Sequence, residues 1–275
     1  MTAHTLPYAV NCSIMFTELP LLERPAAAKA AGFDAVEFWW PFADPVPPGA
    51  EVEAFVHSVE DAGTRLVALN FYGGRSGEPG ILSIPGRAGE FRENVPVATE
   101  IGARLGAVGF NALYGARLPE HLAKEQEDLA TESLVFAARE AAAVGASVLI
   151  EPLSAARGTP VLTASDAAAI VERVQAAGGP AIGILCDLYH LGVNGDDIDA
   201  AIDRHTSLIT HVQIADHPGR GEPGTGGLDL ERYLAALEEH GYSGWVSLEY
   251  EPTTTTLESL AWLPKERRGT TGSSL

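Results

Sequence analysis

The sequence contains few cysteines and no apolar run long enough to cross a membrane. Only two cysteines occur among 275 residues, Cys12 and Cys186, and both lie inside short apolar segments. This placement favours small buried core residues over a disulfide framework and fits a reducing cytoplasm. The first residues, MTAHTLPYAV, lack a basic region followed by an apolar stretch, so we expect no signal peptide and a cytoplasmic location. No apolar run reaches the ~18 residues of a membrane span.

Positive charge is also scarce. The chain has 18 lysines and arginines against 37 aspartates and glutamates, which gives a formal net charge of −19. An acidic surface repels phosphate backbones and anionic lipids, so we expect neither a nucleic-acid partner nor a membrane partner. An anionic substrate would therefore need a local positive group, either a metal ion or an arginine. The sequence leaves open whether the chain forms a homo-oligomer.

Short apolar runs alternate with longer segments rich in alanine and glutamate. Apolar runs of this length are typical of strands buried on both faces of a parallel sheet, and the segments between them read as helices that end at glycines such as Gly32, Gly145 and Gly241. Eight strand–helix units predict an α/β fold, a (β/α)8 TIM barrel, rather than a doubly wound sheet, because no GxGxxG follows the first run. The eight runs cover residues 8–14, 35–40, 65–71, 107–113, 147–152, 182–188, 208–216 and 245–250.

The chain reads as a single domain. Its 275 residues suit one barrel of about 250 residues, and we find no linker or low-complexity block. We expect the barrel domain to cover residues 1–264 and residues 265–275, KERRGTTGSSL, to form a flexible tail. The Pro-rich segment 41–50 and the Gly-rich segment 72–90 follow the second and third strands. In a barrel both would lie at the C-terminal face, where active sites are built.

Four polar side chains occupy late positions in the last four predicted strands. They are Glu151, Asp187, Gln213 and Glu249. A single such residue could face solvent or an arginine, but four on successive strands would converge at the barrel mouth. Buried carboxylates repel one another unless a cation neutralises them, and three acids with an amide oxygen form an oxygen-rich site suited to Mg²⁺ or Mn²⁺. The sequence therefore predicts one divalent metal ion there.

Further polar residues lie near these strand ends. His190 comes three residues after Asp187 and could reach the site from the first turn after the strand, or make a structural hydrogen bond. Glu37 ends the second strand and is a candidate to support the metal ligands, or to form a structural ion pair. Asn70 and Asn111 end the third and fourth strands; they are candidates to donate to substrate oxygens, or to cap loops.

A compact loop, HPGRGEPGTG, follows the seventh strand and carries Arg220 and Glu222. Arginine matches the geometry of a carboxylate, so Arg220 is a candidate to bind an acidic substrate, with Glu222 beside it. Arg87, in the segment IPGR, is a second candidate. Each arginine could instead form a surface ion pair.

Several motifs together resemble the hydroxypyruvate isomerase family of the xylose-isomerase-like barrel superfamily. They are IEPL, DLYH, HVQIAD, GRGEPGTG and EY, with GFDAVEF, GILSIPGRAGEFR and EPTTTTLESLAW elsewhere, so the resemblance runs from about Tyr8 to Leu263. It implies interconversion of hydroxypyruvate and tartronate semialdehyde, or isomerisation of 2-oxo-tetronates. It also implies that Glu151 and Glu249 are the paired catalytic glutamates and that the metal ligands are Glu151, Asp187, Gln213 and Glu249.

The loop after the third strand departs from the family pattern. It reads NFYGGRSGEPG, whereas many relatives have a histidine just before the asparagine and an acid later in the loop. The substrate therefore stays open between hydroxypyruvate, 2-oxo-tetronates and ketoses, the last for a 3-epimerase using the same acids. An abasic-site endonuclease of the superfamily would need histidines where Asn70 and Asn111 stand, and a basic groove. A non-catalytic sugar-acid binding protein is the remaining alternative.

The reaction we expect is a proton transfer through an enediolate. Glu151 and Glu249 fall on the fifth and eighth predicted strands, on opposite sides of the barrel mouth, as a base and an acid flanking a small substrate require. Hydride shift, the other route among metal isomerases of this superfamily, generally uses two metal ions. The sequence offers ligands for one clear site.

Overall fold

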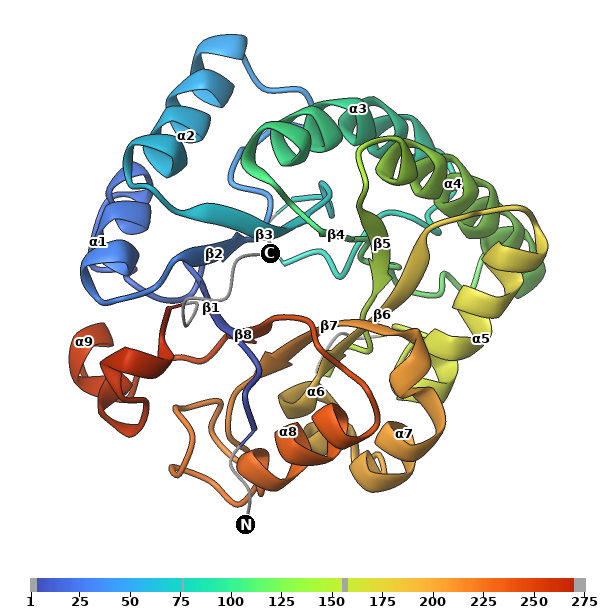
Figure 1. Ribbon diagram of the computed structural model, residues 1–275. Coiled ribbons are helices and arrows are strands. Elements are labelled where there is room, and N and C mark those ends of the chain that lie inside the picture. The colour runs from blue at the N-terminus through green and yellow to red at the C-terminus, as the bar shows by residue number, and fades with distance from the viewer. Residues whose placement is uncertain (1–3, 76, 155–157, 270–275) are drawn as a thin grey trace.

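The computed structural model describes residues 4–75, 77–154 and 158–269, and within them eight parallel strands close into a barrel in chain order (Figure 1). The (β/α)8 barrel is confirmed, and the doubly wound alternative is wrong because β1 pairs with β8, Tyr8 opposite Val246. The strands are β1 Tyr8–Asn11, β2 Ala35–Phe38, β3 Arg65–Asn70, β4 Gly109–Asn111, β5 Ser147–Ile150, β6 Ile182–Asp187, β7 Ile209–Ile214 and β8 Val246–Leu248.

Helices surround the strands, as the view along the barrel in Figure 1 shows. The predicted glycine stops are confirmed: Gly32, Gly145 and Gly241 follow helices with φ of 104°, 75° and 93°, a left-handed backbone that glycine adopts without steric cost. The α-helices are α1 Arg24–Ala30, α2 Gly49–Asp61, α3 Ala88–Leu105, α4 Ala123–Ala143, α5 Ala164–Ala176, α6 Leu188–Asn194, α7 Ile198–His205, α8 Leu230–Glu239 and α9 Thr256–Ser259. Short 3₁₀ helices are η1 Leu21–Glu23, η2 Thr206–Leu208, η3 Leu260–Trp262 and η4 Lys265–Arg267.

The core lies between the barrel and the helices. Phe71, just after β3, stacks on Phe110 of β4 at 5.2 Å and meets Phe91 of α3 edge-on at 5.4 Å. Close packing here depends on Gly102 of α3, because a Cβ at that position would lie 2.3 Å from the Phe110 ring. Both cysteines are unpaired and buried, as predicted.

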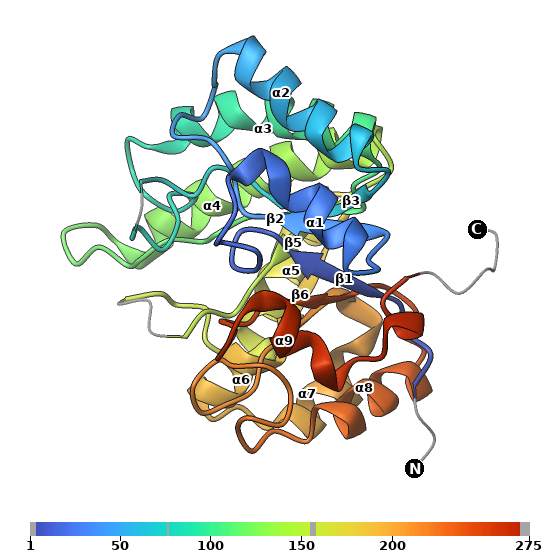
Figure 2. The ribbon, with the colours of Figure 1, turned by 90° about the vertical axis from the view of Figure 1, so that its left-hand side faces the viewer.

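The longer loops gather at one end of the barrel, to the left in Figure 2. This is the end to which the parallel strands run, so their last side chains and the loops after them meet there. Among the described residues no helix is long and apolar enough to cross a membrane.

The segment predicted to be a tail begins in ordered structure. Lys265–Arg267 forms η4, and the Arg268 guanidinium donates hydrogen bonds to the carbonyls of Ala31, Leu260 and Leu263. The rest of that segment, residues 270–275, lies outside the described residues.

Candidate active site

A cavity of about 1180 Å³ opens at the C-terminal end of the barrel. Its walls come from the loops after β2, β3 and β5, and its floor includes Glu151 and Glu249. The lining residues are Trp39, Trp40, Phe42, Ala43, Asn70, Phe71, Gly73, Gly74, Arg75, Gly77, Glu78, Pro79, Leu113, Glu151, Leu153, Ser154, His190, Arg220 and Glu249. The lining thus combines aromatic side chains from the loops after β2 and β3 with polar groups of the strand ends.

The structure places the four predicted metal ligands together on four neighbouring strand ends. Glu151 directly follows β5, Asp187 ends β6, Gln213 lies in β7 opposite Asp187, and Glu249 directly follows β8. All four are at least nine-tenths buried, with exposures of 7, 1, 1 and 3%. Four neighbouring strand ends therefore bring these buried side chains to the same side of the barrel mouth.

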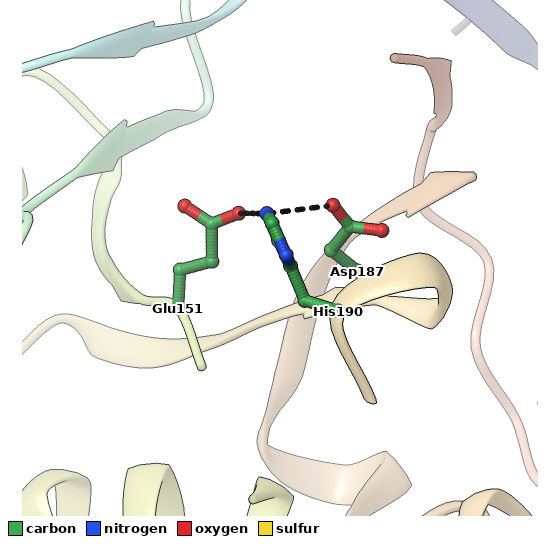
Figure 3. Close-up of side chains that lie close together, drawn as sticks. All are labelled: Glu151, Asp187 and His190. Atoms are coloured by element: carbon green, nitrogen blue, oxygen red, sulfur yellow. Dashed lines mark ion pairs between the residues drawn. The ribbon is translucent and has the colours of Figure 1, made fainter. Parts of the chain in front are cut away.

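Each of these side chains has one polar atom held by the protein and another left for a ligand. Within the described residues Asp187 Oδ2, Gln213 Oε1 and Glu249 Oε2 are buried without a hydrogen-bond partner. Glu151 Oε1 and Asp187 Oδ2 lie 3.7 and 3.5 Å from His190 Nε2, which sits between the two carboxylates (Figure 3). Glu151, Asp187 and His190 together form a buried group that could hold a metal ion. Unpartnered buried oxygens are costly, and a hard divalent cation is the ligand that they fit.

The electrostatics of these acids also favours a cation at this position. Burial, and next the charge of Asp187, raises the pKa of Glu151 to about 8. Burial also raises the pKa of Glu249 well above its usual value, with further contributions from Glu37 and Glu151. Three acids in a water-poor volume cannot all ionise cheaply unless a cation is present. The cluster is therefore suited to bind a cation or, without one, to retain protons.

Glu37 fixes the orientation of the Gln213 amide. Gln213 Nε2 donates to Glu37 Oε1, which directs Gln213 Oε1 toward the other ligands. Glu37 Oε2 contacts His211 Nε2 at 2.7 Å, and Asn11 Nδ2 donates to Glu37 Oε1 at 3.2 Å. Burial raises the pKa of Glu37, but the charge of His211 and hydrogen bonds from His211, Ser247 and Gln213 outweigh burial and lower it overall. Glu37 is thus an ionised acceptor directly behind the ligand set.

His190 presents an N–H group to the cavity. Its Nδ1 accepts the backbone N–H of Ser154 at 3.1 Å, and the Ser154 hydroxyl lies 2.6 Å from the same atom. Burial lowers the pKa of His190, against the charge of Asp187, so the ring is neutral near pH 7. A neutral imidazole that accepts at Nδ1 carries its proton on Nε2. When its Nε2 carries this proton and is not itself a metal ligand, His190 is placed to donate to an oxygen bound beside Glu151 and Asp187.

The predicted substrate-binding arginines lie in different surroundings. Arg220 lines the cavity, where its NH2 group donates to Glu249 Oε1 at 3.0 Å and its guanidinium lies over the Tyr189 ring at 5.2 Å. Arg87 does not line the cavity; it pairs with Glu78 and Glu90 and so supports the loop after β3.

Of the remaining predicted residues, some lie at the cavity and one lies outside it. Asn70 lines the cavity. Asn111 donates to Glu151 Oε2 at 2.6 Å and so holds that carboxylate. Glu222 lies outside the lining, where it accepts hydrogen bonds from the Thr253 backbone N–H and hydroxyl and so ties the β7 loop to the chain after β8.

Sequence reasoning missed two residues of the site, Trp39 and His211. The indole N–H of Trp39 donates to Glu249 Oε1 at 3.0 Å. His211 had a usable signal, because residues two apart in a strand share a face and His211 precedes Gln213 by two. Trp39 follows Glu37 by two in the predicted strand 35–40, but its partner Glu249, 210 residues away in the chain, could not be inferred from that spacing.

The chain is similar to known proteins over nearly its whole length. The sequence is 49% identical over 269 residues to a "Putative hydroxypyruvate isomerase" of Streptomyces coelicolor, covering 95% of this chain and 96% of the relative. It is 31% identical to the "Hydroxypyruvate isomerase" of Escherichia coli K12, covering 95 and 100%. It is 33% identical to the "2-oxo-tetronate isomerase" of Cupriavidus necator, covering 93 and 96%.

A solved structure and a family description match as well. The crystal structure of "AP endonuclease, family 2" from Brucella melitensis superposes with a TM-score of 0.85 at 32% identity, covering 95% of this chain and 100% of that one. The sequence description of the family "Xylose isomerase-like TIM barrel" matches residues 25–266. Since this match spans most of the sequence, the chain belongs to the xylose isomerase-like TIM barrel family.

Proposed function

We propose that this chain is a metal-dependent isomerase of a small hydroxy-carbonyl acid, converting hydroxypyruvate to tartronate semialdehyde. The observation that carries the proposal is the set of buried, unpartnered oxygens on Asp187, Gln213 and Glu249 beside Glu151. Relatives named hydroxypyruvate isomerase cover nearly the whole chain and support the same reaction class. The two unpaired buried cysteines fit a cytoplasmic location.

Glu151, Asp187, Gln213 and Glu249 would hold one Mg²⁺ or Mn²⁺, since the donor set is entirely oxygen. A bound divalent ion would supply Lewis-acid stabilisation of negative charge on the substrate oxygens. His190 Nε2–H and Arg220 would donate to those oxygens and to the substrate carboxylate. Arg220 can take this role because its contacts with Glu249 use only Nε and NH2.

Glu151 and Glu249 would move the proton. Glu151 follows β5 and Glu249 follows β8, so they flank the site from different sides of the barrel. One removes the proton from C3 of hydroxypyruvate to give an enediolate, and a proton returns at C2 while the hydroxyl proton passes from O3 to O2. Asn111 on Glu151, and Trp39 with Arg220 on Glu249, hold the two carboxylates in place for this exchange.

A 2-oxo-tetronate is the second candidate substrate. The Cupriavidus necator relative carries that name, and a cavity of about 1180 Å³ has room for a four-carbon acid. The net charge of −19 argues against an abasic-site endonuclease, because it would repel DNA. The asparagines at positions 70 and 111 argue against it as well, because such an enzyme would need histidines there. A sugar-acid binding protein would bind these acids without turning them over.

The deciding experiment is a substrate panel of hydroxypyruvate, 2-oxo-tetronates and neutral ketoses, assayed with EDTA, Mg²⁺ and Mn²⁺. We expect turnover of an acid substrate, its loss in EDTA and its recovery with the metal. Binding of the acids without turnover would identify a binding protein. Full activity of protein shown to be metal-free would refute the metal site.

The proton path has its own test. In D₂O the product should carry deuterium at the carbon that gains hydrogen, because a carboxylate exchanges its proton with water. Glu151→Gln and Glu249→Gln should each lower kcat at least ~10²-fold, with metal occupancy measured in each variant. Complete retention of the substrate's own hydrogen would favour a hydride shift over the path proposed here.

A further inference from the structure

We propose that Trp39 is a positioning residue that holds the Glu249 carboxylate in its metal-binding and proton-transfer orientation, an inference that rests on the proposed function. Trp39 is the first residue after β2, and its backbone N–H donates to the Ser13 hydroxyl at 2.8 Å. Its indole Nε1–H donates to Glu249 Oε1 at 3.0 Å. The side chain lines the cavity, and the residue is 37% exposed.

Two donors meet on one oxygen of Glu249. Trp39 Nε1 and Arg220 NH2 each lie 3.0 Å from Oε1, whereas Oε2 is buried and has no hydrogen-bond partner among the described residues. A free carboxylate rotates about its terminal bond and exchanges its two oxygens. Donors on Oε1 remove that freedom, so Oε2 stays the oxygen that is left for a metal ion.

Trp39 and Arg220 are not interchangeable in this role. Arg220 is a cation at the cavity wall, so an anionic substrate competes with Glu249 for its guanidinium. The indole N–H is neutral and only donates, and it offers an anionic substrate no net charge. Glu249 therefore keeps in Trp39 one donor that it does not share with the substrate. Trp39 holds the metal ligand throughout the catalytic cycle.

The neighbouring tryptophan provides a matched control. The indole Nε1–H of Trp40 donates to the carbonyl of Asp44 at 2.9 Å, and its ring packs edge-on against Phe42 at 5.1 Å. Trp39→Phe and Trp40→Phe therefore each delete one indole N–H and keep an aromatic ring. Only the first deletion touches a metal ligand.

Metal affinity is the first measurement. Calorimetric titration of EDTA-stripped protein with Mn²⁺ should show about tenfold weaker binding for Trp39→Phe, the lower end for loss of a group that orients a metal ligand. Trp40→Phe should retain wild-type affinity. In a Glu249→Ala background, Trp39→Phe should cause no further loss, because a residue that acts through Glu249 has nothing left to orient. An additional loss in that background would overturn the proposal.

A spectroscopic measurement separates positioning from a role as cavity wall. The ¹⁵N-indole signal of Trp39, identified by its absence from Trp39→Phe, should shift in Glu249→Gln and on titration with Mg²⁺, whether or not a substrate is known. With the active substrate, Trp39→Phe should lower kcat and leave KM within about twofold. Wild-type metal affinity in folded Trp39→Phe, or a raised KM with normal kcat, would show that Trp39 only lines the cavity. Trp39→Leu, measured by the same titration, provides a second variant.

The two proposals fail separately. If no acid is turned over, the proposed function fails, while the titration and the indole signal still decide whether Trp39 orients Glu249. If acids are turned over and Trp39→Phe binds Mn²⁺ normally, the function stands and Trp39 loses its role.

Discussion

Metal-free protein should become less stable as the pH rises from 6.5 to 8. The pKa of Glu151 is raised from 4.5 to about 8 by burial and then by Asp187, and Glu249 is shifted in the same direction. In this window the folded chain holds protons that the unfolded chain has already released. Unfolding therefore releases protons, and raising the pH favours the unfolded state.

The window is chosen so that other groups do not mask this effect. The pKa values of His190 and His4 are lowered by burial from 6.5, so these two histidines bind more protons in the unfolded chain and oppose the trend, but that difference fades above pH 6.5. Above it, each proton retained by the carboxylate cluster contributes about 1.4 kcal/mol per pH unit. From 6.5 to the Glu151 pKa of about 8, this amounts to about 2 kcal/mol for that group, and Glu249 adds to it.

The assay is urea unfolding in EDTA at pH 6.5, 7.25 and 8, followed by circular dichroism. Glu151→Gln, which is neutral throughout, should lose the share of the pH dependence that belongs to Glu151. With saturating Mn²⁺ the slope should reverse, since metal binding needs ionised ligands and strengthens as the pH rises. The reasoning is refuted if the free energy of unfolding of the metal-free protein stays constant or increases between pH 6.5 and 8.

Further variants test the groups around the predicted metal ligands. Glu37→Leu should destabilise EDTA-treated protein by roughly 3–5 kcal/mol in urea unfolding, because it leaves His211 and the Gln213 amide buried without their acceptor. Glu37→Gln keeps an acceptor oxygen and should lower the free energy of unfolding by less, so equal losses in the two variants would contradict this prediction. Arg220→Ala should raise KM for acid substrates about ten- to hundred-fold and much less for neutral sugars in steady-state assays; an unchanged KM would remove Arg220 from substrate binding.

The fold could be predicted because strands covered on both faces must be apolar. All eight predicted strands are confirmed, yet most ladders stop earlier than the apolar runs do, as at Asn11 in the run 8–14. Among the residues beyond the ladders, Cys12 and Phe71 are still buried, whereas Glu151 and Glu249 line the candidate site. Helix starts were harder to predict than helix ends: α4 begins at Ala123, and its charged first turn carries no apolar periodicity.

The candidate site could be predicted only as far as a strand position determines it. A side chain at the carboxyl end of a barrel strand points to the mouth, so the ligand residues follow from strand ends. Loop residues do not obey this rule. Arg87, Arg220 and Glu222 were all loop candidates for substrate binding. In the structure, however, Arg87 forms ion pairs with Glu78 and Glu90, and Glu222 accepts a hydrogen bond from Thr253. Which charge pairs with which depends on loop paths that a single sequence does not encode locally.

The charge balance of the site is compatible with the acidic substrate proposed for this acidic protein. Three carboxylates and a divalent cation would leave one negative charge, which Arg220 at Glu249 offsets. Gln213 contributes a ligand oxygen without adding charge, whereas a fourth carboxylate would leave the site negative and repel the substrate. The amide needs an acceptor to fix its orientation, and Glu37, which also contacts His211 Nε2, supplies one. A site that is close to neutral must then bind its substrate through directed donors, and His190 Nε2–H and Arg220 are the groups placed to provide them.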